Sequence, residues 1–152
     1  MPSAVQKFRY RGEDALRLSA DRKAFDTLRQ WLSEIAAELN LTERIQKQLL
    51  IACDEVFTNI ATHAYAGNSG EAVISIEFEP DDRILRIIFC DSGKEFNPLE
   101  APTPDITAKL ADRAIGGLGI FMVKKMMDSL TYRREGEFNI LTIEKKMEIS
   151  DK

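Results

Sequence analysis

The sequence predicts an α+β fold, a two-layer α/β sandwich in which helices cover one face of a mixed sheet. Two segments before residue 66 repeat apolar side chains at helical spacing, and an antiparallel hairpin follows between residues 71 and 90. A third helix and a second hairpin follow before residue 148. Because strands and helices do not alternate regularly, a doubly wound parallel fold fits this order poorly.

The first predicted helix follows an extended opening around residues 7–18. Ser19 stands where a capping residue would precede the helix, and the apolar side chains after it recur three and four residues apart. These side chains are Phe25, Leu28, Trp31, Leu32, Ile35 and Leu39. The spacing predicts a helix that buries one stripe, with Trp31 in the core.

A second, longer helix is predicted from Thr42, which can cap it, to about Tyr65. Alternating and β-branched residues then predict two strands, at 71–79 and 83–90, that are joined by a turn at residues 80–82. These two strands are expected to form an antiparallel hairpin.

The chain between residues 92 and 117 is rich in prolines, acidic residues and glycines, and only residues 106–113 suit a short helix. Loops of more than about a dozen residues in a compact domain are usually functional. We therefore expect a lid at about residues 94–116.

The third helix is predicted to begin at the glycines after this lid and to continue through Leu130. Two closing strands are predicted at 130–135 and 137–147, with a turn around Gly136.

Composition favours one domain, residues 1–152, of which 44% are hydrophobic and 30% charged. The net charge of -4 argues against a nucleic acid or anionic membrane as the partner, because phosphate neutralisation needs clustered basic residues. The chain has neither an apolar run of about 18 residues nor a signal-peptide pattern, so a cytoplasmic protein is expected. Cys53 and Cys90 lie in apolar runs and are expected to be buried small hydrophobes.

The second predicted helix carries a row of polar residues, Glu55, Asn59 and His63, beside its apolar stripe. Their four-residue spacing places them along the border of the stripe, with His63 falling inside it. Buried polar groups are costly unless they are hydrogen-bonded or bound to a metal. The row therefore indicates either a functional site or an internally satisfied set of side chains.

Chemically, the first two residues of this row suit phosphoryl transfer. The side-chain oxygen of Asn59 is a hard ligand for Mg²⁺, and Glu55 one turn away can deprotonate an attacking hydroxyl.

Asp91 ends a strongly apolar strand and is followed by Ser92 and Gly93. An aspartate in this place is often a turn former, but its carboxylate can also accept a hydrogen bond from an exocyclic amine. A glycine two residues later lets the backbone pass close to a flat base.

Residues 115–120, Ile-Gly-Gly-Leu-Gly-Ile, place glycines where a loop becomes a helix, so that free N–H groups point toward an anion. Simple hinge geometry is the alternative. The pattern is neither a P-loop nor a dinucleotide fingerprint.

Three segments, DEVFTNIATHAY, FCDSGKEFNP and GGLGIFMVKKMMD, resemble in this order the nucleotide-binding boxes of the ATPases that include sensor histidine kinases, DNA gyrase and heat-shock chaperones. Within that group the chain most resembles the bacterial anti-sigma-factor serine/threonine kinases. The resemblance covers most of the chain and implies the histidine-kinase-like ATPase fold.

By this resemblance, ATP and Mg²⁺ are the expected cofactors, Glu55 is the general base and Asn59 is the Mg²⁺ ligand. Asp91 would bind the adenine amino group, and Thr142 would reach the adenine through water. The implied nucleotide-binding set is Asn59, His63, Asp91, Gly93, Phe96, Gly116, Gly117, Leu118, Gly119 and Thr142.

The resemblance implies a kinase that phosphorylates a small anti-sigma-factor antagonist on serine or threonine and sequesters a sigma factor, with a homodimer as the usual assembly. Ile115 departs from the glycine that the wider family has at the start of the third box. The rival hypothesis is a non-catalytic module in which ATP only organises the lid so that a partner can dock. A third, an accessory domain of a phosphatase or response-regulator system, differs mainly in its partner.

Overall fold

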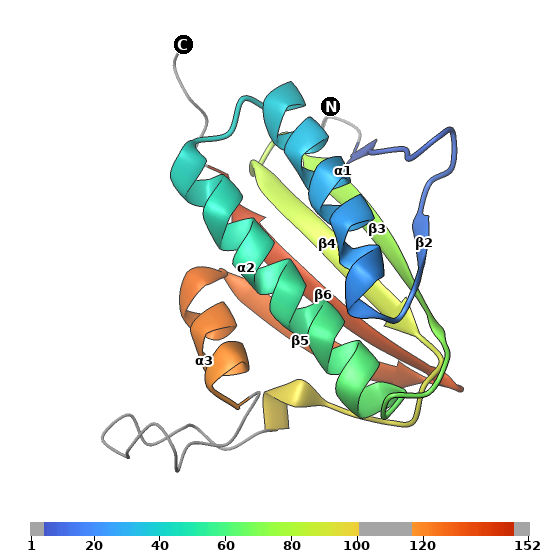
Figure 1. The fold of residues 1–152 in the computed structure, drawn as a ribbon. Helices are drawn as coiled ribbons and strands as arrows, with labels where there is room; N and C mark the ends of the chain where they lie inside the picture. The colour runs from blue at the N-terminus through green and yellow to red at the C-terminus, as the bar shows by residue number, and fades with distance from the viewer. Residues whose placement is uncertain (1–4, 101–116, 148–152) are drawn as a thin grey trace.

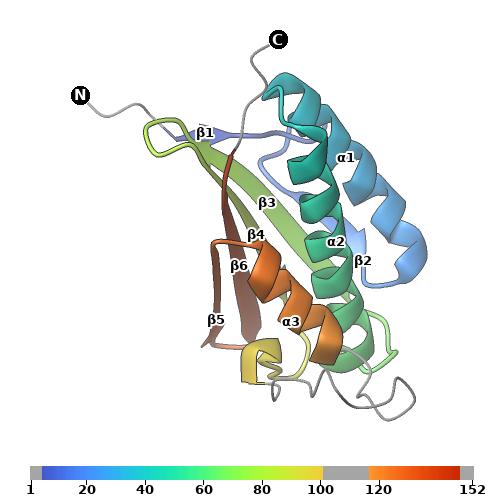
Figure 2. The same ribbon diagram turned by 90° about the vertical axis from the view of Figure 1, so that its left-hand side faces the viewer.

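The computed structural model describes residues 5–100 and 117–147, in which a six-stranded sheet is covered on one face by three α-helices (Figures 1 and 2). This arrangement confirms the predicted two-layer α+β fold. The elements are β1 (Gln6–Lys7), β2 (Leu16–Ser19), η1 (Arg22–Ala24), α1 (Phe25–Glu38), α2 (Glu43–Asn59), η2 (Ile60–Ala64), β3 (Glu71–Glu79), β4 (Ile84–Asp91), η3 (Pro98–Glu100), α3 (Gly117–Met126), β5 (Ser129–Glu135) and β6 (Phe138–Lys146).

The strands lie in the order β1-β3-β4-β6-β5, with β2 pairing with β3 as well. Every pairing among the described strands is antiparallel, so the expectation of a mixed sheet was wrong in this detail. The reason is the position of β6. Strands β4 and β5 run in the same direction, but β6 lies between them and pairs with both.

The start of the first helix differs from the prediction. Ser19 pairs with Glu71 at the end of β2, so its backbone belongs to the sheet and cannot begin a helix. Asp21 takes the capping role instead, because its side chain accepts a hydrogen bond from the N–H of Ala24 (3.1 Å). The predicted Thr42 cap of α2 is confirmed by a bond from the N–H of Ile45 to the threonine hydroxyl (3.3 Å).

The second helix reaches Tyr65 as predicted, but its last turn is a π-helix, η2. The N–H of Tyr65 donates to the carbonyl of Ile60, five residues earlier (3.0 Å). This wider turn changes the direction of the side chains that follow Asn59. Ala64 is buried, whereas His63, predicted inside the apolar stripe, is exposed.

The core lies between the helices and the inner face of the sheet, and Trp31 is buried in it as predicted (2% exposed). The fully buried side chains include Leu28, Trp31, Ile45, Phe57, Ile74, Ile76, Leu85, Ile87, Phe89, Val123 and Ile143. Cys53 belongs to this core, but Cys90 is only partly buried, because it points to the face of the sheet away from the helices.

The third helix ends four residues earlier than predicted. Ser129 and Leu130 already belong to β5, and the ammonium group of Lys145 in β6 binds the carbonyl of Met126 at the end of α3 (2.7 Å). The predicted lid at 94–116 lies outside the described residues except for 94–100, and so does the short helix expected at 106–113. In the described parts of the chain, no helix has the length and apolar character needed to cross a membrane.

Candidate functional site

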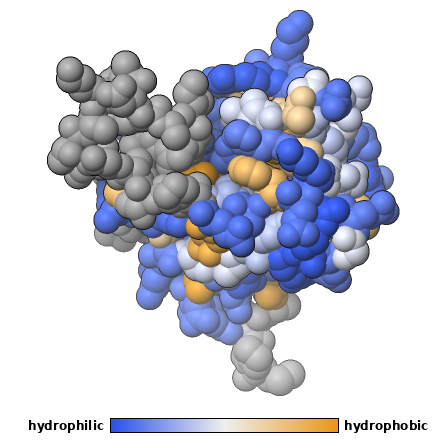
Figure 3. Space-filling model, turned by 90° about the horizontal axis from the view of Figure 1, so that it is seen from below, coloured by the Kyte–Doolittle hydropathy of each residue, from blue (hydrophilic) through white to orange (hydrophobic). Residues whose placement is uncertain are grey.

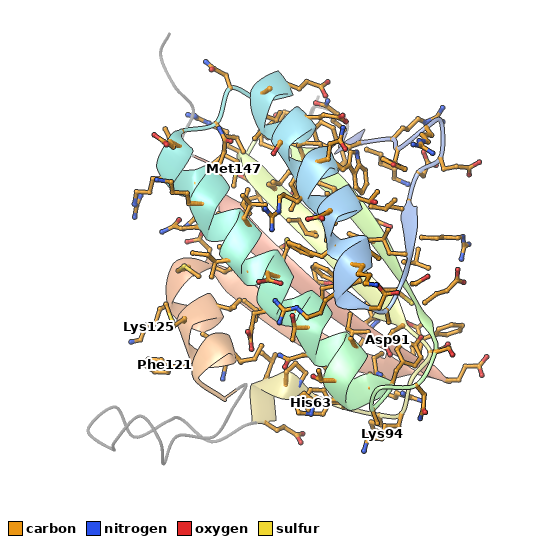
Figure 4. The ribbon with its side chains drawn as sticks, viewed as in Figure 1. His63, Asp91, Lys94, Phe121, Lys125 and Met147 are labelled. Atoms are coloured by element: carbon orange, nitrogen blue, oxygen red, sulfur yellow. The ribbon has the colours of Figure 1, made fainter. Side chains whose placement is uncertain are left out.

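A pocket opens between the C-terminal end of α2 and the sheet. This end of α2 lies at the lower end of the molecule in Figure 1. Asp91, Lys94 and His63 lie at this end, whereas Met147 lies at the other (Figure 4). Figure 3 views the molecule from this end and shows hydrophobic surface among hydrophilic side chains. The pocket is lined by Val56, Asn59, Ile60, Ala64, Phe89, Asp91, Phe96, Pro98, Tyr132, Asn139 and Leu141.

The polar side chains that line the pocket are buried, which is uncommon for polar groups. In residues 5–100 and 117–147, three polar or charged residues are buried, namely Asn59, Asp91 and Asn139, and all three line this pocket. Buried polar groups are normally confined to places where they are paired or where a ligand binds. Their common location therefore marks the pocket as the candidate site.

Asn59 ends α2 and is 5% exposed. Its Nδ2 atom is buried and has no hydrogen-bond partner among residues 5–100 and 117–147. Leaving such a group unpaired costs about 1–3 kcal/mol. The fold holds this amide in place by the packing of the last turn of α2, and the amide remains available to a ligand.

Asp91 ends β4 with one carboxylate oxygen fully engaged. Its Oδ1 accepts hydrogen bonds from the N–H of Gly93 (2.9 Å) and from Nδ2 of Asn139 (2.8 Å). No described residue donates to Oδ2. Burial raises the pKa of Asp91, whereas the bonds from Asn139 and Gly93 and the charge of Arg134 act in the opposite direction. The free oxygen can accept a hydrogen bond from a ligand.

The raised pKa has a consequence for stability. The folded state holds the proton of Asp91 more tightly than the unfolded chain does, so the stability gained by protonation is lost as pH rises through the folded-state pKa. We therefore expect Asp91→Asn to melt at a higher temperature than the wild type at neutral pH, with a difference that widens as pH rises from about 4 through the raised folded-state pKa. Thermal unfolding followed by circular dichroism measures it, and a difference that narrows over this range would contradict the assignment.

Gly93 fits tightly against the π-turn of η2. A Cβ atom at this position would lie 2.5 Å from the carbonyl oxygen of Ala64, which also accepts a hydrogen bond from the N–H of Lys94 (2.9 Å). Glycine therefore lets the chain after Asp91 lie directly on the end of the helix and close the pocket.

Gly93→Ala is expected to lower the free energy of unfolding by about 1–3 kcal/mol, because the added methyl group must displace backbone. Urea denaturation measures the change. Ser92→Ala is the matched control, since Ser92 is exposed and its replacement should cost less than about 0.5 kcal/mol. Equal losses in the two variants would show that the close approach at Gly93 is unimportant.

Glu55 lies one turn before Asn59 and contacts the start of α3. A Cβ atom on Gly119 would collide with its carboxylate, so glycine at this position makes room for the side chain. Burial raises the pKa of Glu55, and the charge of Asp54 raises it further. Of the other predicted glycines, Gly117 begins α3 and Gly116 lies outside the described residues; Leu118 follows Gly117 in the helix.

His63 and Phe96 meet at the rim. Their rings stack with centroids 4.7 Å apart and an interplanar angle of 16°. Phe96 lines the pocket, whereas His63 is exposed and covers the outer side of the phenylalanine ring.

Thr142 is not brought to the pocket. On β6 the residues Asn139, Leu141 and Ile143 are buried toward the helices, so Thr142 faces the opposite side of the sheet, where it pairs with Ile88 of β4. Successive side chains of a strand point to opposite faces. The prediction that Thr142 reaches the adenine through water therefore does not fit a nucleotide held at Asp91.

Asn139 lines the pocket but was not predicted as a site residue from the sequence. It pairs with Asp91 across the β4–β6 ladder and faces the pocket with Tyr132 of the neighbouring strand. The apolar alternation of Leu141 and Ile143 was the available signal, because it places residue 139 on the inner face and residue 142 on the outer face.

The described residues contain no group of three or more His, Cys, Asp or Glu side chains that could hold a metal ion. Asn59 is the oxygen donor that the pocket offers from α2. A metal held here would depend on ligands from a bound molecule or water.

A model of the histidine kinase-like ATPase domain matches residues 18–145. The chain is 28% identical over 130 residues to the serine/threonine-protein kinase BtrW of Bordetella bronchiseptica. This alignment covers 86% of this chain and 91% of that protein. The chain is also 28% identical over 130 residues to the serine-protein kinase RsbW of Staphylococcus aureus, with 82% and 81% covered.

Among solved structures, the RsbU and RsbW domains of a Mycobacterium tuberculosis protein match with a TM-score of 0.61 and 19% sequence identity. The match covers 88% of this chain and 32% of that longer chain. At this identity the likeness shows a common fold, which agrees with the fold expected from the sequence.

Proposed function

Because the chain belongs to the histidine kinase-like ATPase domain family, we propose that it binds Mg²⁺–ATP between α2 and the sheet and transfers the γ-phosphoryl group to a partner protein. The acceptor is a serine or threonine hydroxyl. The observation that carries the proposal is the meeting of Asn59, Asp91 and Asn139, the buried polar residues of the described chain, in one pocket.

The adenine base binds at Asp91. Its 6-amino group is a donor, and the unengaged Oδ2 of Asp91 is an acceptor in a site where water is largely excluded. Gly93 and Phe96 lie beside this carboxylate and give the base room and an apolar contact.

Asn59 holds the Mg²⁺ ion. The Nδ2 of this amide has no hydrogen-bond partner among the described residues, so no described contact of that group stops the amide from turning its oxygen toward the ion, and an amide oxygen is the kind of ligand that Mg²⁺ accepts. The remaining ligands of the ion would come from phosphate oxygens and water, since the described residues supply no acidic cluster. When bound, the ion offsets the negative charge of the phosphates.

Glu55 is the general base. It takes the proton of the attacking hydroxyl while the oxygen–phosphorus bond to the acceptor forms and the bond to the leaving ADP oxygen breaks. Its raised pKa places it nearer to neutral pH, where a general base is most effective. Gly119 keeps space beside its carboxylate near the start of α3. The glycine segment 116–119 would contact the phosphates.

We further propose an anti-sigma regulatory role in the cytoplasm, with the whole chain acting as one domain and residues 94–116 as its lid. The chain would phosphorylate an anti-sigma-factor antagonist and, in its other state, sequester a sigma factor, as a homodimer. The names of its relatives, serine-protein kinase and serine/threonine-protein kinase, support the choice of acceptor.

The test is transfer of ³²P from labelled ATP to small proteins of a lysate from the source organism, followed by mapping of the phosphorylated residue. The proposal predicts phosphoserine or phosphothreonine with wild-type protein, and no label with Asn59→Ala. ATP binding without any transfer would instead identify a non-catalytic module that uses ATP to control docking.

A further inference from the structure

The side chain of Asn139 on β6 makes several hydrogen bonds in addition to the backbone pairing of the strand. It is 4% exposed, and every polar atom of its side chain is engaged. Its Nδ2 donates to Oδ1 of Asp91 (2.8 Å) and to the carbonyl of Lys94 (2.9 Å). The side chain thereby joins β6 to the end of β4 and to the loop that follows it.

The carbonyl end of the same amide accepts from three donors. These are the hydroxyl of Tyr132 (2.5 Å), Nη1 of Arg134 (3.1 Å) and the N–H of Phe96 (3.3 Å). Arg134 is itself fixed, because its Nη1 also donates to the carbonyl of Gly93 (2.8 Å).

These contacts allow one orientation of the amide. A flipped side chain would set the NH₂ group against two groups that can only donate, the N–H of Phe96 and Nη1 of Arg134. It would also set the carbonyl oxygen against two acceptors, the carbonyl of Lys94 and Oδ1 of Asp91. Asn139 therefore always presents a donor to Asp91.

We propose that Asn139 is the positioning residue that gives the pocket its preference for adenine, because it fills Oδ1 of Asp91 and leaves Oδ2 to accept the 6-amino group. The inference rests on the proposed function. Without Asn139, the N–H of Gly93 alone would hold Oδ1, and the carboxylate could rotate or take other partners.

The selectivity of the base is the property to measure. ATP is compared with purine riboside triphosphate, which has hydrogen in place of the 6-amino group, by calorimetric titration in the presence of Mg²⁺. The wild type is expected to bind ATP at least about tenfold more tightly, the value of one hydrogen bond to a charged group.

Asn139→Leu should weaken ATP binding about tenfold and leave the binding of purine riboside triphosphate within about threefold, so that the preference disappears. Thr142→Val is the matched control on the outer face of the same strand and should keep the preference. If Asn139→Leu does not fold, Asn139→Ser replaces it, because a serine hydroxyl is too short to reach Asp91 and leaves room for water.

The outcomes separate the two proposals. If the wild type prefers ATP and the Asn139 variants either keep that preference or lose both nucleotides equally, Asn139 has only a structural role and this inference is wrong. If the wild type binds neither nucleotide, the proposed function fails, and the inference fails with it.

Discussion

Asn59→Leu is expected to bind Mg²⁺–ATP at least about 100-fold more weakly than the wild type and yet to be more stable without nucleotide. The loss of affinity follows from the loss of the oxygen proposed to hold the ion. The gain in stability, about 1–2 kcal/mol, is expected because an apolar side chain of similar size replaces an amide whose buried Nδ2 has no hydrogen-bond partner among the described residues. Calorimetric titration and urea denaturation measure the two effects.

Asn59→Asp is the matched control. It keeps an oxygen in the same place, so Mg²⁺-dependent binding of ATP should survive, while the buried charge should lower the melting temperature of the free protein. If Asn59→Leu instead lowers the free energy of unfolding by several kcal/mol, the amide has a structural partner and the argument from its missing hydrogen bond fails.

The second large effect is expected for Glu55→Gln, which should slow phosphoryl transfer by about 10²–10⁴-fold and leave the affinity for ATP within about threefold. Glutamine has the shape of glutamate, so the contact with Gly119 is kept and only the ability to take a proton is lost. The rate is measured as single-turnover transfer of the labelled phosphoryl group from ATP to the acceptor protein that the lysate experiment identifies.

Asp54→Asn provides the control for this variant. Asp54 is the neighbouring carboxylate on α2, and its charge raises the pKa of Glu55. Removing that charge should leave the maximum rate within about threefold and move the acid limb of the pH–rate profile to lower pH, because Glu55 then loses its proton more easily. An unchanged rate in Glu55→Gln would show that Glu55 is not the general base.

Much of the fold was readable from the sequence because the signals are local. The cap at Thr42 depends on residues within three positions, and each hairpin depends on a turn between two adjacent strands. The order of the strands was not readable in this way. The placement of β6 between β4 and β5 depends on contacts across about fifty residues, and it makes the sheet antiparallel throughout the described strands.

The site residues on α2 could be predicted from the sequence, whereas the contact between residues of β4 and β6 could not. The spacing of Glu55 and Asn59 placed them one turn apart, as found. His63 was misplaced because nothing in the pattern signals the π-turn that begins at Ile60. The residue of β6 that meets Asp91 was not predicted, because it depends on the register of β4 against β6, which pairs Asp91 with Asn139 and places Thr142 opposite Ile88.

The most direct test of the account is calorimetric titration of the wild-type protein with ATP, once with Mg²⁺ and once with EDTA. We predict saturable binding of one ATP per chain with Mg²⁺ and much weaker binding with EDTA. If ATP does not bind in either condition, the pocket formed by Asn59, Asp91 and Asn139 is not a nucleotide site, and the proposed kinase function is wrong.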